Sequence, residues 1–261
     1  MDEIKKALMP YGVYNKTQHS SPYFFKIKKY NRVLYYIGAN HSHNPKDKQY
    51  PFIRRYWNEF LKVAKPETSS VAVEGGLRKL EKSEEEAIKN WSEGSFITFL
   101  AERKKYKQFS PEPDRRTLLK EVIPKYSKEV IQYYYFCISV YYWGLNYRTM
   151  NFEEYIVKTL KRDEKELGWK NFDFSLENMK KIHKSLFKGE FDELNTDFFY
   201  TQINPTFRTT IINCFSQDKG IVRDAFIIKK LLDHWKKGEN LFIVFGYTHA
   251  IVQEPALKKL T

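Results

Sequence analysis

The sequence predicts an α/β fold built around a mostly parallel sheet. Three short segments, at 32–37, 70–73 and 107–110, are expected to be strands, and the first two of them are mostly apolar. They alternate with two segments of helical pattern, at 50–64 and 83–105. This order of strand, helix, strand, helix and strand is typical of parallel βαβ units.

Each of these elements has its own local signal. The segment at 32–37 is a short β-branched and aromatic run, as expected of a buried strand. The segment at 50–64 carries apolar residues at helical spacing and stops before Pro66. The segment at 83–105 opens with Ser83 followed by three glutamates, which favours a helix start, and we expect this helix to break near Gly94.

The remaining elements complete the same fold. The first 30 residues are expected to be irregular, and a helical insertion is expected at about 118–200. A helix at 221–236 precedes the clearest strand of the chain, at 241–245. A last short helix is expected to begin at Glu254.

The composition is that of a globular protein. The chain has 261 residues, of which 42% are hydrophobic, 17% aromatic and 30% charged, and we expect a single α/β domain over 1–261. Its most apolar stretch, at 131–143, is shorter than the roughly 20 residues that a membrane span needs. The N-terminal residues lack the apolar segment of a secretion signal. We therefore expect a cytoplasmic protein without a transmembrane segment.

The net charge of +13 raises the question of nucleic-acid binding. The lysines are spread along the whole chain, often at expected solvent positions of helices. No recognition helix, zinc finger or aromatic RNA-binding signature accompanies them. The pattern favours a solvated basic surface over a nucleic-acid partner.

Two predicted strands each end in a Gly-x-x-His element. The elements are Gly38-Ala39-Asn40-His41 and Gly246-Tyr247-Thr248-His249. Ligands of open parallel sheets bind in the crevice at the carboxyl ends of the strands. A glycine there lets the backbone turn sharply. We therefore expect both histidines to point into one crevice.

Two further predicted strands are followed by acidic residues, Glu74 and Glu112. Two imidazoles and two carboxylates at one sheet edge are a suitable ligand set for a divalent metal such as Mn, Co or Zn. His43, two positions after His41, is a candidate additional ligand. The same groups could equally form a general acid/base set without a metal.

Arg223 and Asp224 lie near the start of the predicted helix at 221–236. In one interpretation Asp224 favours the helix N-terminus and Arg223 is solvated. In the other, Arg223 lies at the sheet edge and binds an anionic group or stabilises a developing oxyanion.

These residues together resemble the superfamily that contains the erythromycin esterases, the TraB/PrgY proteins, the Tiki proteases and the haem-binding ChaN lipoproteins. The resemblance rests on both Gly-x-x-His elements, on Val71-Ala72-Val73-Glu74 and on Val222-Arg223-Asp224. It implies a central, mostly parallel sheet from two related halves, with helices on both faces. It also implies that His41, Glu74, Arg223 and His249 line one pocket.

The resemblance leaves the chemistry open. Tiki-like members resemble metal-dependent proteases, esterase members act without a required metal, and ChaN-like members bind haem. The chain lacks the secretion signal or membrane anchor expected of the Tiki and ChaN types. This argues against an extracellular protease or a haem-uptake role.

We therefore expect an intracellular hydrolase acting on an ester or peptide bond of a small-molecule or peptide substrate. In one version a metal held by His41, His249 and a carboxylate activates water. Glu74 is then the general base and Arg223 stabilises negative charge. In a metal-free version His41 or Glu74 activates water directly. The alternative is a non-catalytic protein whose pocket holds a metal, haem or small ligand, with tyrosine as a possible haem ligand.

Overall fold

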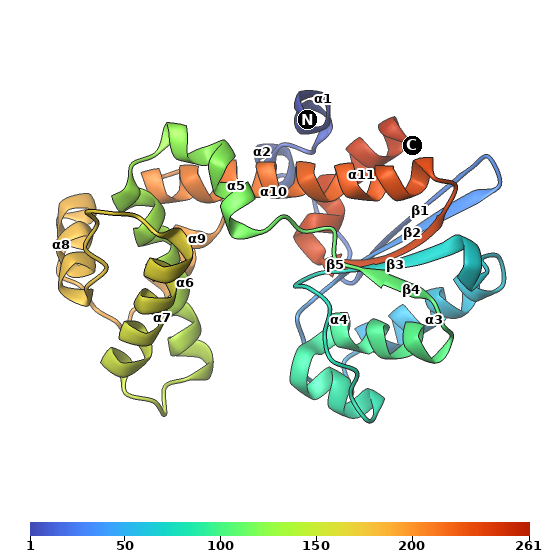
Figure 1. The fold of residues 1–261 in the computed structure, drawn as a ribbon, viewed down its shortest axis with the longest axis horizontal. Coiled ribbons are helices and arrows are strands. Elements are labelled where there is room, and N and C mark those ends of the chain that lie inside the picture. The colour runs from blue at the N-terminus through green and yellow to red at the C-terminus, as the bar shows by residue number, and fades with distance from the viewer. The chain divides into compact units, whose positions relative to one another are not determined.

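The computed structural model describes all residues, 1–261, and confirms the α/β fold with a mostly parallel sheet (Figure 1). The five strands lie in the order β1-β2-β5-β3-β4. Their bounds are β1 (Tyr23–Lys29), β2 (Arg32–Ala39), β3 (Ser69–Val73), β4 (Lys107–Phe109) and β5 (Asn240–Gly246). Only β1 runs antiparallel to its neighbour, β2; the pairs β2–β5, β5–β3 and β3–β4 are parallel.

The chain divides into two compact units, which we call the sheet unit (1–113 and 223–261) and the helical unit (114–222). The sheet unit contains α1 (Asp2–Ala7), α2 (Tyr11–Tyr14), α3 (Gln49–Leu61), α4 (Glu84–Arg103) and α11 (Tyr247–Leu260). The helical unit contains α5 (Arg115–Val122), α6 (Lys128–Asn146), α7 (Phe152–Leu167), α8 (Leu176–Phe187) and α9 (Thr196–Ile203). The long helix α10 (Ile211–Lys236) begins in the helical unit and ends in the sheet unit. The helical unit includes the helical insertion expected at about 118–200.

Helices cover both faces of the sheet. Alternate residues of a strand face opposite sides. Tyr35 and Ile37 of β2 belong to a buried cluster with residues of α3 and α4, such as Trp57. The intervening Tyr36 turns the other way, and its hydroxyl donates to Oε1 of Gln253 in α11 at 2.8 Å. The sheet is therefore held between α3 and α4 on one side and α11 on the other.

The strand β1 was not expected, because the first 30 residues lack a strong hairpin signal. The two residues between β1 and β2, Tyr30 and Asn31, have φ values of 52° and 62°. Both therefore occupy the left-handed region that two-residue hairpins require, where Asn-Gly or Asp-Gly is the usual pair. Because tyrosine is not typical of the first position of such a turn, the sequence does not predict the hairpin.

The expected starts of the two last helices were wrong. Helix α10 begins ten residues before the expected position at 221, where Thr210 accepts a hydrogen bond from the backbone N–H of Asn213. Arg223 and Asp224 thus lie inside a helix and not near its start. Helix α11 begins at Tyr247 and not at Glu254, so Pro255 is inside the helix. Packing on the sheet outweighs the hydrogen bond that this proline cannot make.

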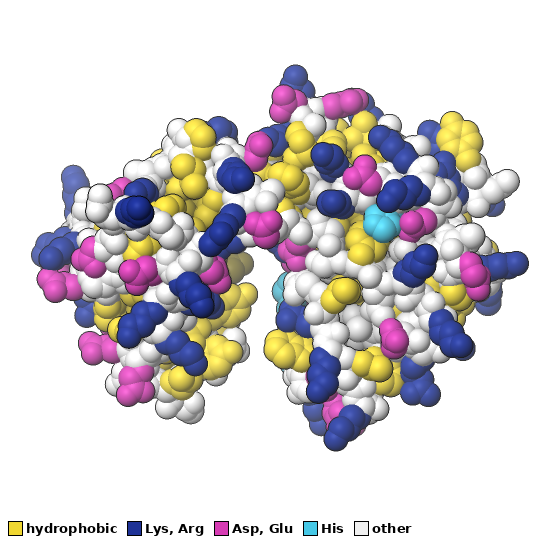
Figure 2. Space-filling view, viewed as in Figure 1, with side chains coloured by type: hydrophobic (Ala, Val, Ile, Leu, Met, Phe, Trp, Pro, Cys, Tyr) yellow, Lys and Arg dark blue, Asp and Glu magenta, His cyan; other side chains and the backbone are white.

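Two further expectations were a solvated basic surface and the lack of a transmembrane segment. On the face shown in Figure 2, lysine and arginine side chains are spread over both units and interleaved with aspartate and glutamate. This distribution resembles a solvated basic surface more than a single basic patch. No helix of the chain combines the length and the apolar character needed to cross a membrane.

Gly38 owes its place in β2 to close packing and not to a special turn. Its φ is not in the left-handed region. A Cβ there would lie 2.8 Å from Cβ of Ala250 and 3.1 Å from Cα of Tyr247, both in α11. The first Gly-x-x-His glycine therefore allows α11 to pack directly on β2.

We expect Gly38→Ala to lower the free energy of unfolding by about 1–3 kcal/mol, because the added methyl group overpacks the interface of β2 with α11. Urea denaturation of the two proteins measures this difference. Gly12→Ala is the matched control, since a Cβ at Gly12 would meet nothing within 4 Å. Equal effects of the two substitutions would contradict the packing argument.

Candidate functional site

The carboxyl ends of the parallel strands bring the predicted site residues to one edge of the sheet. Strands β2 and β5 are neighbours, and Ala39 pairs with Gly246 at their ends. His41 and His249 therefore follow adjacent strand ends. Glu74 follows β3, which lies on the other side of β5. Glu112 comes shortly after β4, the next strand along.

Arg223 lies at the centre of this group. Its Nη2 donates to Oε1 of Glu74 at 2.7 Å, and its Nε donates to Oε1 of Glu112 at 2.8 Å. Nη2 also donates to Glu112, and Nη1 donates to Nε2 of His249 at 2.6 Å. Two carboxylates thus offset the charge of one guanidinium, and four of its five N–H groups are engaged. Arg223 therefore lies at the sheet edge, as the second interpretation expected, and is not a solvated helix residue.

His249 is oriented by a buried chain of hydrogen bonds. Its Nδ1 lies 2.6 Å from Oδ1 of Asp224, which also accepts from Nε2 of Gln253 at 2.7 Å. Gln253 in turn accepts from the hydroxyl of Tyr36. Because a guanidinium can only donate, Nε2 of His249 accepts from Arg223 and the ring proton lies on Nδ1. Asp224 therefore fixes both the tautomer and the orientation of this histidine.

Glu74 is an acceptor on both of its oxygens. Oε1 accepts from Arg223 and Oε2 accepts from the backbone N–H of Gly246. Burial alone would raise the pKa of this carboxyl, but His249, Arg223 and His41 opposite it, together with the Gly246 N–H, lower its pKa to about 2. Glu74 is thus a firmly ionised group and a weak base.

Gly246 makes room for two functional side chains. A Cβ at this position would lie 3.1 Å from Oε2 of Glu74 and 3.2 Å from Nε2 of His41. Its φ of −54° is open to any residue, so the expected sharp turn is not the reason for glycine here. The second Gly-x-x-His glycine therefore allows Glu74 and His41 to come close to the end of β5.

His41 forms a pair with a residue that the sequence did not single out, Glu93 of α4. Nδ1 of His41 lies 2.7 Å from Oε1 of Glu93. The side chain of Glu93 is only 3% exposed, whereas that of His41 is 61% exposed. The hydrogen bond to Glu93 raises the pKa of His41 to about 9, although partial burial opposes this shift. The other ring nitrogen, Nε2, is the one near Gly246.

The position of Glu93 depends on a break in α4. Trp91 and Ser92 have non-helical backbone angles, and Ser92 has φ of 55° and ψ of −146°. The break expected near Gly94 is thus confirmed two residues earlier. Such strained serine conformations persist where the surrounding structure enforces them. The break immediately precedes Glu93, and this break was the one sequence signal that could have pointed to it.

His43 does not join the cluster. Its Nδ1 lies 2.9 Å from the backbone oxygen of Lys89, and its side chain is exposed. It was a candidate because it lies two positions after His41 in the loop that follows β2. The loop folds back, with Ser42 N–H donating to Asn40 O at 2.7 Å.

The arrangement does not fit a divalent metal. No three His, Cys, Asp or Glu residues of the chain are grouped so that they could hold one. The guanidinium of Arg223 takes the central position among Glu74, Glu112 and His249, and it uses the lone pair of His249 that a metal would need. The negative charge of the two carboxylates is balanced here by Arg223.

Comparisons of the chain with protein-family models, with curated proteins and with solved structures find no match.

Proposed function

We propose that the protein is a metal-independent hydrolase in which His41, oriented by Glu93, activates water for attack on an ester or peptide bond of a small-molecule or peptide substrate. The observation that carries this proposal is the His41–Glu93 pair. A buried carboxylate holds Nδ1 of an exposed imidazole and leaves Nε2 beside the ends of the parallel strands. This is the arrangement by which a carboxylate orients a general base.

His41 is a better candidate for the base than Glu74 or His249. Glu74 has a pKa of about 2 and both of its oxygens accept hydrogen bonds. His249 has both ring nitrogens engaged, by Asp224 and Arg223. Only His41 combines a basic nitrogen with an exposed ring.

In this reaction Nε2 of His41 takes a proton from water as the water oxygen attacks the carbonyl carbon. The tetrahedral intermediate collapses when the imidazolium returns that proton to the leaving alcohol or amine. Two sources of N–H groups support the developing oxyanion. One is the N–H of Arg223 that remains after its four hydrogen bonds. The other is the first turn of α11, which has no side-chain cap.

The proposal is tested by hydrolysis of a panel of p-nitrophenyl esters and short peptides between pH 6 and 10, with the enzyme-free rate subtracted. Because a base must be unprotonated, we expect kcat/KM to rise with pH, to reach half of its plateau near pH 9, the pKa of His41, and to level off above that pH. Treatment with EDTA should leave the rate unchanged. Loss of activity in EDTA, or no activity on any substrate, would contradict the proposal.

A further inference from the structure

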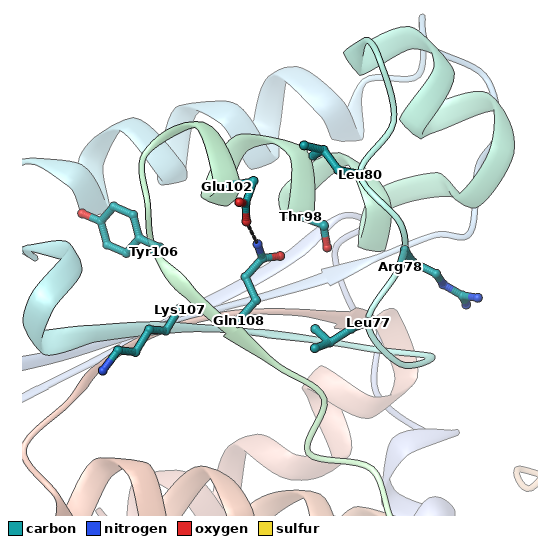
Figure 3. Close-up of a pocket in the computed structure, with 8 residues that line it drawn as sticks. All are labelled: Leu77, Arg78, Leu80, Thr98, Glu102, Tyr106, Lys107 and Gln108. Atoms are coloured by element: carbon teal, nitrogen blue, oxygen red, sulfur yellow. Dashed lines mark hydrogen bonds between the residues drawn. The ribbon is translucent and has the colours of Figure 1, made fainter.

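A cavity lies in the sheet unit, apart from the His41 site. Its volume is about 350 Å³, within the range of roughly 300–1,000 Å³ for small-molecule sites. Helix α4 contributes Thr98 and Glu102, β4 contributes Gln108, and the loop after β3 contributes Leu77 and Leu80 (Figure 3). No residue of the His41 site lines it.

Two polar atoms of this cavity are buried without a hydrogen-bond partner. They are Oγ1 of Thr98 and Oε1 of Gln108. Thr98 is only 5% exposed, and in Figure 3 its side chain points from α4 toward Gln108. Leaving such groups unsatisfied destabilises a fold. Because both side chains line the cavity, a molecule bound there can supply the missing hydrogen bonds.

The side-chain amide of Gln108 has a fixed orientation. Its Nε2 donates to Oε2 of Glu102 at 3.1 Å, and a carboxylate can only accept. Oε1 of Gln108 is therefore the atom left for a ligand, and it requires a donor. The hydroxyl of Thr98 can donate in return to an acceptor on the same ligand.

The carboxylate of Glu102 accepts the hydrogen bond from Gln108, and the other lining groups favour a ligand that is neutral and partly apolar. Leu77 and Leu80 are 60% and 48% exposed, so they offer apolar surface to a substituent. The charged ends of Arg78 and Lys107 point away from the centre in Figure 3. The Arg78 guanidinium lies over the ring of Trp91, 4.7 Å from its centroid.

We propose that this cavity binds a small neutral amide with an apolar substituent. The ligand N–H donates to Gln108, its carbonyl accepts from Thr98, and its substituent lies against Leu77 and Leu80. The proposal does not rest on the hydrolase activity. It concerns binding alone.

The test is an NMR titration of the protein with N-acetyl-leucine N-methylamide. We expect binding with a Kd on the order of 1 mM, given the small size of the probe. Thr98→Val should weaken binding at least tenfold, because the variant keeps the shape but loses the hydroxyl. Its Tm should equal or exceed that of the parent, since the lost hydroxyl has no partner in the ligand-free protein.

Thr159→Val provides a matched control. Thr159 is also a buried helical threonine, but its hydroxyl donates to Ile156 O at 2.9 Å and it lies outside the cavity. This variant should bind the probe as the parent does and should have a lower Tm. No binding by the parent, equal binding by Thr98→Val, or a loss of Tm in Thr98→Val as large as in Thr159→Val would overturn the proposal.

Discussion

Replacing His41 with glutamine is expected to lower kcat/KM for ester hydrolysis by about 100- to 10,000-fold, the usual contribution of a general base. Glutamine retains an N–H that can donate to Glu93, so the buried carboxylate keeps a partner. It has no group that titrates in place of the imidazole. The variant should therefore stay folded and also lose the rise of activity toward pH 9, which steady-state kinetics over the same pH range measures.

His43→Gln is the control for this substitution. His43 lies two positions further along the same loop, and its ring contacts the backbone of Lys89 and not the site. Its variant should keep the parent's kcat/KM and pH profile. Activity that survives in His41→Gln, or is lost equally in both variants, would exclude His41 as the base.

The Glu93→Gln variant distinguishes two effects of Glu93 on His41, the orientation of the ring and its raised pKa. A neutral amide can still accept the Nδ1 proton of His41, but it removes the interaction that holds the pKa of His41 at about 9. We expect the limb of the pH profile to move toward the ordinary histidine pKa of 6.5, with a lower plateau rate. An unshifted limb would show that another group controls the profile.

The sequence located the strand ends and the groups that follow them, because strand patterns and Gly-x-x-His elements are local. It placed His41, Glu74, Glu112 and His249 at one edge, where the structure has them. It could not find Glu93, because the contact with His41 spans 52 positions and depends on a break in the middle of a helix. Apart from the helix break expected near Gly94, nothing local distinguishes this glutamate from others on solvated helices.

The roles within the site were harder to predict than its members. Two carboxylates and two histidines suggest a metal until the position of Arg223 is known. Helix α10 begins at Ile211, so Arg223 lies in the middle of a helix. Its contact with Glu74 joins residues 149 positions apart, which no local pattern reveals. One of the two interpretations placed Asp224 at a helix N-terminus for the same reason, whereas it holds His249. A shift of one helix start thus changed the roles of two residues.

Replacing Arg223 with methionine is expected to lower the free energy of unfolding by about 3–5 kcal/mol at pH 8. The substitution leaves Glu74 and Glu112 close together without the guanidinium that pairs with both, and breaking a buried ion pair on one side has a cost of this order. Urea denaturation at pH 8 and pH 4 measures the effect. Arg55→Met is the control, because the contacts of Arg55 with Glu59 and Tyr56 are exposed and their loss should change stability by less than about 1 kcal/mol.

The pH dependence follows from the pKa of Glu74, which is about 2 in the folded protein against an ordinary value of 4.5. A lowered pKa contributes stability above pH 4.5, and this contribution is lost as the pH falls toward 2. In Arg223→Met the guanidinium no longer lowers the pKa of Glu74, so this pKa lies above that of the parent and less stability is lost as the pH falls. The two proteins should therefore differ less at pH 4 than at pH 8. A difference that is the same at both pH values would mean that Arg223 stabilises the fold by packing and not by its charge.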